Sequence, residues 1–194
     1  MKHSGKSTIQ VIMKNKSSMQ KAIHRYLSNG KSTMSKIIYS ILLLFVFAFT
    51  NAQSIPRWKL NDLQAAIKNA DKPTVFNFWA TFCKPCVEEI PYFQQIIKKY
   101  DSAGVRLVLI SLDLSEAYPK QISSFAAKHS FTSPIKFLNE TNADLFCPAV
   151  DASWSGAIPA SLFVNSKTGY RKFFEDQLSK EKFEKEIQAM IKRN

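Results

Sequence analysis

The sequence predicts an α/β protein, a three-layer sandwich in which a mixed central sheet lies between helices on both faces. Short runs rich in β-branched and aromatic residues alternate along the chain with longer segments of helical periodicity. Near the end of the chain, the turn at residues 166–169 joins two such runs as a hairpin, so at least one pair of strands is antiparallel.

The first predicted helix covers residues 62–69, where apolar side chains recur at helical spacing before Pro73. Residues 74–79 (TVFNFW) are β-branched and aromatic and predict a buried strand. A long helix is predicted for residues 87–100, with a kink at Pro91 because proline removes one backbone donor.

A second buried strand of the parallel type is predicted at residues 105–110, and Pro119 is expected to open a helix that reaches Lys128. A short strand at residues 135–137 and a short helix at residues 142–146 follow.

The last part of the chain contains the hairpin. Its strands are predicted at residues 160–165 and 170–174, and a final helix at residues 180–192 has apolar side chains at helical spacing.

The positive charge of the chain is concentrated near its amino terminus. The net charge is +12, and residues 1–52 hold eight of the 27 basic side chains and no acidic ones. Residues 53–194 are nearly balanced, with 19 basic and 15 acidic side chains. The distribution therefore argues against nucleic acid as a partner.

The amino-terminal segment contains a predicted export signal. Ile37 to Phe49 is a run of 13 uncharged residues, preceded by Lys36 and followed by the small residues Thr50 and Ala52. A secretory signal needs roughly 7–15 apolar residues, whereas a membrane-spanning helix needs about 20. We expect cleavage before Gln53 and a location in the periplasm or cell envelope; an uncleaved membrane anchor is the alternative.

Three segments follow from this pattern. We expect residues 1–33 to be a basic, disordered extension, residues 34–52 to be the signal peptide and residues 53–194 to be one folded domain. Met34-Ser35-Lys36 would begin a signal peptide well, so we expect translation to start at Met34. An extension that is translated would lie against anionic lipid head groups.

The chemistry is predicted at a pair of cysteines. Cys83 and Cys86 stand where a predicted strand meets a helix, and they can close a small reversible disulfide ring. A helix amino terminus favours an anion, and Lys84 acts in the same direction, so Cys83 should be the reactive thiolate. Cys86, one turn further along, should be more buried and should resolve the mixed disulfide.

Other interpretations of the pair remain. Two buried cysteines or half of a zinc site share the same spacing. The sequence has no second C-x-x-C, and His129 has no metal-ligand spacing to the pair, so no metal is expected.

The segment around the two cysteines resembles the active-site segment of exported thioredoxin-like proteins of the TlpA/ResA group. It reads Trp79-Ala80-Thr81-Phe82-Cys83-Lys84-Pro85-Cys86 and is followed by Glu88-Glu89-Ile90-Pro91. A second segment is similar to the one that bears the cis-proline of that fold, and it reads Gly156-Ala157-Ile158-Pro159-Ala160-Ser161-Leu162-Phe163. The resemblance covers roughly residues 58–194.

The resemblance implies a thioredoxin-like fold and a thiol–disulfide oxidoreductase with no cofactor beyond the Cys83–Cys86 disulfide. Pro159 would be cis and lie beside the pair, where it excludes metal; an ordinary trans proline at a strand start is the alternative. The backbone of Ile158 would bind an extended substrate, and Trp79 and Trp154 are further expected substrate-binding residues. Trp154 could equally belong to the core.

The sequence departs from thioredoxins proper at one position. Their buried Asp, six residues before the nucleophile, is replaced by Asn77, which cannot accept a proton. The related exported reductases carry a Glu three residues after the second cysteine, and this is Glu89 here. We expect Glu89 to assist proton transfer at Cys86, with a plain surface carboxylate as the alternative.

The expected activity is disulfide exchange with proteins outside the cytoplasm, as a reductant rather than as an oxidant. The partners are protein thiols and disulfides and a membrane electron donor, and we expect a monomer. Cytochrome c biogenesis is one role known in the group; general thiol maintenance in the envelope is preferred. Alternatives are a disulfide isomerase, a non-catalytic binding module, or a copper chaperone that adds Cys147. Cys147 is otherwise a buried apolar thiol, with a third redox or regulatory thiol near the active site as the alternative.

Overall fold

The computed structural model describes Lys21 and residues 54–192. The predicted extension and signal peptide, residues 1–33 and 34–52, lie outside the described residues except for Lys21. No helix in the described part of the chain combines the length and the apolar character needed to cross a membrane.

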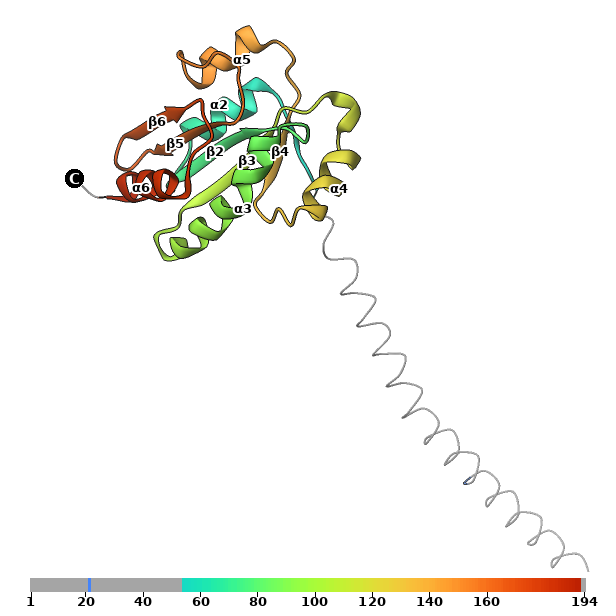
Figure 1. Ribbon diagram of the computed structural model, residues 1–194, viewed down its shortest axis with the longest axis horizontal. Coiled ribbons are helices and arrows are strands. Elements are labelled where there is room, and N and C mark those ends of the chain that lie inside the picture. The colour runs from blue at the N-terminus through green and yellow to red at the C-terminus, as the bar shows by residue number, and fades with distance from the viewer. Residues whose placement is uncertain (1–20, 22–53, 193–194) are drawn as a thin grey trace, which may run out of the picture. The chain divides into compact units, whose positions relative to one another are not determined.

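One mixed sheet forms the centre of the domain, with its strands in the order β1-β4-β3-β2-β5-β6 (Figure 1). The pairs β2–β3, β3–β4 and β1–β4 are parallel, whereas β2–β5 and β5–β6 are antiparallel. The strands are β1 Arg57–Trp58, β2 Thr74–Trp79, β3 Arg106–Ser111, β4 Ile135–Leu138, β5 Ala160–Asn165 and β6 Tyr170–Phe174.

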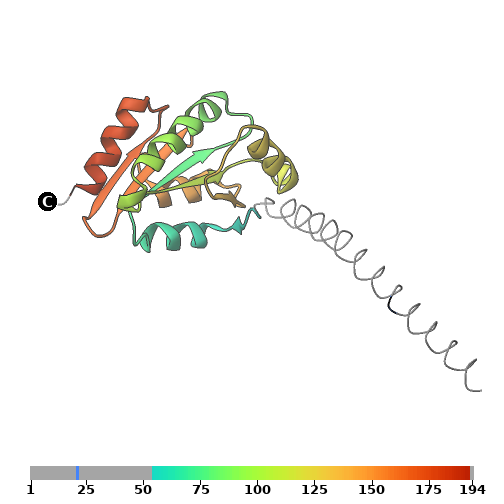
Figure 2. The ribbon, with the colours of Figure 1, turned by 90° about the horizontal axis from the view of Figure 1, so that it is seen from below.

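Helices cover both faces of this sheet, so the predicted sandwich is confirmed. The helices are α2 Leu60–Lys68, α3 Lys84–Lys99, α4 Lys120–Lys128, α5 Ala143–Val150 and α6 Lys180–Ile191, with short 3-10 turns η1 Asp101–Ala103 and η2 Ser115–Ala117. Figure 2 shows α3 (green) and α6 (red) on one face of the sheet and α2 (teal) on the other.

Two hydrophobic cores result from the alternation of side chains along the strands. On β2, Val75 and Trp79 belong to the core that also contains Phe93 of α3 and Phe183 of α6, whose rings stack 3.7 Å apart. Phe76 belongs to the opposite core, with side chains of α2 and α5. Strand β2 is buried at all six positions and therefore gives a rigid base for the residues that follow it.

Two predicted boundaries differ from the structure by three residues or more. Helix α3 begins at Lys84 rather than at residue 87, because Cys83 caps it and Pro85 fits its first turn without a backbone donor. Helix α5 continues to Val150 instead of ending at residue 146, although Pro148 lies inside it. Phe146, Cys147 and Val150 are all buried, and this packing outweighs the missing hydrogen bond.

Candidate active site

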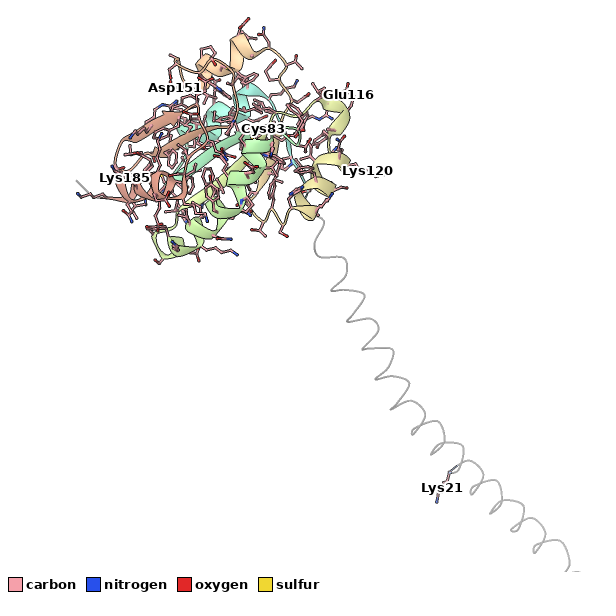
Figure 3. The ribbon with its side chains drawn as sticks, in the orientation of Figure 1. Lys21, Cys83, Glu116, Lys120, Asp151 and Lys185 are labelled. Atoms are coloured by element: carbon pink, nitrogen blue, oxygen red, sulfur yellow. A yellow bond between two sulfur atoms is a disulfide. The ribbon has the colours of Figure 1, made fainter. Side chains whose placement is uncertain are left out.

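The two cysteines predicted to react with each other form a disulfide. The Cys83–Cys86 bond joins Cα atoms 5.4 Å apart. Cys83 is the residue that caps α3, and its sulfur accepts a hydrogen bond from the backbone N–H of Cys86 at 3.4 Å. Figure 3 shows Cys83 at the amino end of that helix. The unsatisfied N–H groups and dipole of a helix start favour negative charge on this sulfur.

The two sulfur-bearing residues differ in accessibility. Cys83 keeps 7% of its surface exposed, whereas Cys86 keeps none. A thiolate approaching from solvent therefore reaches the Cys83 sulfur, and Cys86 becomes the leaving or resolving group.

Ile158 and Pro159 lie at the end of β5 that is nearest the disulfide. Strand β5 pairs with β2 through Ala160 and Phe78, so the residues just before Ala160 run beside the chain that leads into Cys83. The Ile158–Pro159 peptide bond is cis, as predicted. The backbone of Ile158 forms no hydrogen bond with any other described residue, and it remains available to a ligand.

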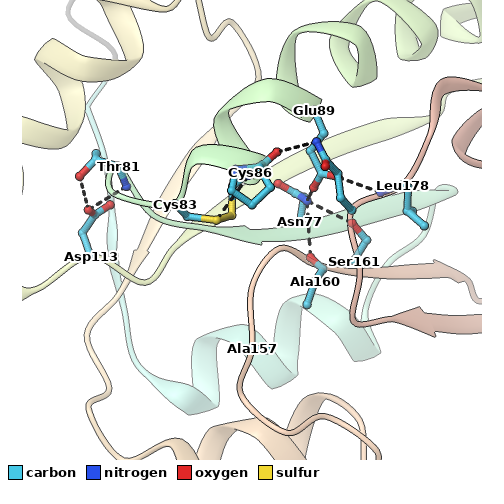
Figure 4. The surroundings of a disulfide bond; sticks show 12 residues. Asn77, Thr81, Cys83, Cys86, Glu89, Asp113, Ala157, Ala160, Ser161 and Leu178 are labelled. Atoms are coloured by element: carbon cyan, nitrogen blue, oxygen red, sulfur yellow. Dashed lines mark hydrogen bonds between the residues drawn. A yellow bond between two sulfur atoms is a disulfide. The ribbon is translucent and has the colours of Figure 1, made fainter.

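Glu89 is fully buried behind the disulfide, so the alternative of a surface carboxylate is wrong. One carboxylate oxygen accepts a hydrogen bond of 2.8 Å from Asn77 Nδ2, and the other accepts one of 3.1 Å from the backbone N–H of Leu178 (Figure 4). Burial raises the pKa of Glu89 to about 7, and the two hydrogen bonds only partly offset it.

Asn77 connects the buried carboxylate to the sheet. Its Nδ2 also donates to Ser161 Oγ at 3.1 Å, and the residue has no exposed surface. Its Oδ1 has no hydrogen-bond partner among the described residues. Asn77 thus stands at the position of the aspartate of thioredoxins proper, and the buried carboxyl beside it is that of Glu89.

Trp79 and Trp154 were expected to bind substrate, with the core as the alternative for Trp154, and the structure places both in the core. Trp79 has no exposed surface and packs edge-on against Phe131, with ring centroids 5.3 Å apart. Trp154 is 5% exposed and lies 4.6 Å from the ring of Phe78. Both indoles belong to the hydrophobic cores, because the strand and loop that carry them turn them inward.

Asp113 is a site residue that the sequence analysis missed. Its Oδ1 accepts hydrogen bonds from the backbone N–H of Thr81 at 3.0 Å and from Thr81 Oγ1 at 2.6 Å, and Ser111 Oγ donates to Oδ2 at 2.8 Å. The contacts hold the chain two residues before Cys83. The available signal was the position of Asp113 just after a buried strand, at the sheet edge that also carries the cysteines.

The model of the AhpC/TSA family matches residues 47–168, more than half of the chain. The chain belongs to the AhpC/TSA family.

Curated relatives confirm the resemblance to the TlpA/ResA group. Thiol-disulfide oxidoreductase ResA of Oceanobacillus iheyensis is 27% identical over 126 residues, which are 65% of this chain and 58% of the relative. Sporulation thiol-disulfide oxidoreductase A of Bacillus subtilis is 33% identical over 70 residues, which are 36% of this chain and 42% of the relative. The chain thus spans about half of the length of such relatives.

Solved structures confirm the thioredoxin-like fold. A thiol:disulfide interchange protein of the thioredoxin family from Chlorobium tepidum has a TM-score of 0.52 at 21% identity, covering 66% of this chain and 85% of the other. A DsbE-type interchange protein from Chlorobium tepidum has a TM-score of 0.51 at 21% identity, covering 64% and 84%.

Cys147 is free and only 3% exposed. Burial raises the pKa of its thiol, which makes the thiolate scarce. Its sulfur lies under the loop that leads to Pro159, where a Cβ added at Gly156 would meet it at 3.7 Å. Within the described residues no three His, Cys, Asp or Glu side chains gather as metal ligands would.

Proposed function

We propose that this member of the family is an extracytoplasmic thiol–disulfide oxidoreductase that reduces disulfides in protein substrates through Cys83 and Cys86. The observation that supports it most is the disulfide at the amino end of α3, with Cys83 slightly exposed and Cys86 fully buried. The relatives named thiol-disulfide oxidoreductases support the same reaction.

The reaction begins with the reduced enzyme. The Cys83 thiolate attacks one sulfur of a substrate disulfide, a mixed disulfide forms, and the first substrate sulfur leaves as a thiolate. The backbone of Ile158, beside Pro159, pairs with the extended substrate chain and aligns its disulfide with Cys83.

Resolution of the mixed disulfide requires Cys86 to lose its proton. Glu89 lies three residues further along α3 and is the buried group that accepts it. The Cys86 thiolate then attacks the Cys83 sulfur, the second substrate sulfur leaves as a thiolate and takes the proton from Glu89, and the Cys83–Cys86 disulfide forms. Two electrons pass from the enzyme to the substrate in each cycle, and an external dithiol donor at the membrane restores the reduced enzyme.

The location of the enzyme follows from the export signal predicted at residues 34–52. Amino-terminal sequencing of the protein recovered from the cell envelope tests this part of the proposal. We expect a mature chain that begins at Gln53; a product that retains Ile37 to Phe49 contradicts cleavage and favours the membrane anchor.

Insulin reduction with dithiothreitol as donor tests the activity. We expect catalysis by the wild type, loss in Cys83→Ser, and accumulation of mixed disulfide in Cys86→Ser. Cys147→Ser is the matched control, because it removes the third thiol and should retain the activity. A wild type that does not accelerate the reaction contradicts the proposal.

The direction of exchange is tested by the reduction potential of the Cys83–Cys86 couple. A working reductant should have a potential more negative than about −200 mV, whereas oxidants of the DsbA type lie near −120 mV. Equilibration with glutathione buffers, followed by mass spectrometry of the alkylated protein, measures this value.

A further inference from the structure

The loop before Ile158 is held by a carboxylate from another part of the chain. Glu175 directly follows β6, and one of its oxygens accepts hydrogen bonds from the backbone N–H of Ala157 at 2.9 Å and of Ser155 at 3.0 Å. Its second oxygen lies 3.0 Å from the same Ser155 nitrogen, and the Ser155 hydroxyl also donates to the carboxylate. One side chain thus satisfies several donors of a three-residue loop.

The conformation of the loop makes this convergence possible. Gly156 has a φ of 99°, in the region that favours glycine, and this turn lets the N–H groups on both sides of it point to the same carboxylate. From the other side, Trp154 Nε1 donates a hydrogen bond of 2.8 Å to the carbonyl of Ala157. The residue that precedes Ile158 is therefore fixed at both its N–H and its carbonyl.

The segment that carries Glu175 also contacts the helix of the cysteines. Gln177 Nε2 donates to the carbonyl of Pro85 at 3.2 Å, and the backbone N–H of Leu178 donates to Glu89 at 3.1 Å. Residues 175–178 thus connect the loop before Pro159 with the Cys83–Cys86 turn, and Figure 4 shows Ala157 and Leu178 in the surroundings of the disulfide.

We infer that Glu175 is a positioning residue for the protein substrate, because its carboxylate holds the loop Ser155–Ala157 so that the free backbone of Ile158 faces the substrate chain beside Cys83. The inference rests on the proposed function. Glu175 touches neither sulfur, so it should affect the binding of a polypeptide and not the chemistry of the cysteines.

The test compares a protein disulfide with a small one. Insulin needs to pair with the backbone of Ile158, whereas bis(2-hydroxyethyl) disulfide has no peptide group and needs only Cys83. Glu175→Ala should raise the KM for insulin about tenfold, because the loop must then be ordered during binding, while kcat changes by less than about twofold. The rate with the small disulfide should stay within about twofold of the wild type.

Two variants control this comparison. Glu175→Gln keeps an acceptor oxygen and should recover most of the KM. Glu184→Ala also removes a carboxylate, one that contacts Lys99 at the far end of α3, roughly 24 Å along the helix from Cys83. It should leave both substrates unaffected.

The order of the loop can also be measured directly, without any catalytic assay. Amide hydrogen exchange of Ser155 and Ala157, followed by NMR, should be slow in the wild type and in Glu175→Gln and at least about tenfold faster in Glu175→Ala. If Glu175→Ala does not fold, Ser155→Ala removes a single donor and should raise the KM for insulin about threefold.

The outcomes separate the inference from the proposed function. An active wild type combined with an unchanged insulin KM in Glu175→Ala overturns the positioning role alone. Equal losses on insulin and on the small disulfide also overturn it, because they indicate a general structural defect. A wild type that reduces neither disulfide overturns the proposed function and the role of Glu175 together.

Discussion

The side-chain amide of Asn77 donates a hydrogen bond of 2.8 Å to the carboxylate of Glu89, and neither residue has any exposed surface. Asn77 lies on β2 and Glu89 on α3, so the pair joins the sheet to the helix that carries the cysteines. Burial raises the pKa of Glu89 to about 7, which lets this carboxyl change its protonation state near neutral pH. A proton acceptor for Cys86 needs this property.

The first prediction concerns stability. The carboxyl of Glu89 titrates near 4.5 in the unfolded chain and near 7 in the oxidised native protein, so between these values the native state binds more protons. Stability should therefore fall as pH rises from about 4.5 to 7 and then level off. Urea unfolding measures the difference in free energy of unfolding between Glu89→Gln and the wild type. This difference should be more favourable to Glu89→Gln at pH 8 than at pH 5, by about 2 kcal/mol.

Glu88→Gln is the control for that measurement, because Glu88 is the exposed neighbour on the same helix. Its stability should follow the wild type at both pH values. Parallel curves for Glu89→Gln and the wild type would show that the buried carboxyl does not have a raised pKa.

The second prediction concerns catalysis by the same carboxyl. Glu89→Gln should slow the resolution of the mixed disulfide by about a hundredfold, since Gln cannot accept the proton of Cys86. In the wild type this step should accelerate with pH and reach a plateau above about 7, where Glu89 is ionised. Rapid acid quenching and mass spectrometry of the mixed disulfide with insulin measure the step; an equally fast Glu89→Gln variant removes Glu89 from the mechanism.

The third prediction uses the position at which this chain departs from thioredoxins proper. Asn77→Asp would place a second carboxylate within hydrogen-bond distance of Glu89, and both cannot ionise at low cost. We expect a loss of about 3 kcal/mol in the free energy of unfolding at pH 8 and a smaller loss at pH 5, where the two carboxyls can share a proton.

A double-mutant cycle isolates the contact between these residues. Adding Glu89→Gln to the Asn77→Asp background should restore much of the lost stability, because only one carboxylate then remains. Additive effects of the two substitutions would show that the residues do not interact.

The sequence predicts those parts of the fold that depend on local pattern. The predicted bounds of β2, β5 and β6 agree with the observed Thr74–Trp79, Ala160–Asn165 and Tyr170–Phe174, because buried strands and a tight hairpin leave strong signals. Strand β1 was not predicted, since two residues carry no period and only their pairing with β4 makes them a strand.

The same division applies to the site. Cys83 and Cys86 are predicted from the spacing that their chemistry requires, and Pro159 from the family resemblance of its segment. Asp113 and Glu175 were not found, because their importance depends on which distant backbone groups they contact. The sequence misplaces Trp79 and leaves Trp154 undecided for a related reason: the direction of these side chains relative to the core is set by tertiary packing and not by their place next to a motif.

The last prediction concerns the third cysteine, for which the sequence left a buried thiol and a third redox or metal-binding thiol as alternatives. Burial raises the pKa of Cys147, so in the oxidised protein it should react with a maleimide only when the domain unfolds. Its labelling rate in increasing urea should follow global unfolding, and Cys147→Ala should retain the insulin activity and the reduction potential of the wild type. Cys83 and Cys86 are both bound in the disulfide of the oxidised protein, so the maleimide reports on Cys147. Rapid labelling of the folded protein would contradict the buried thiol, and a changed potential in Cys147→Ala would place Cys147 in the redox cycle.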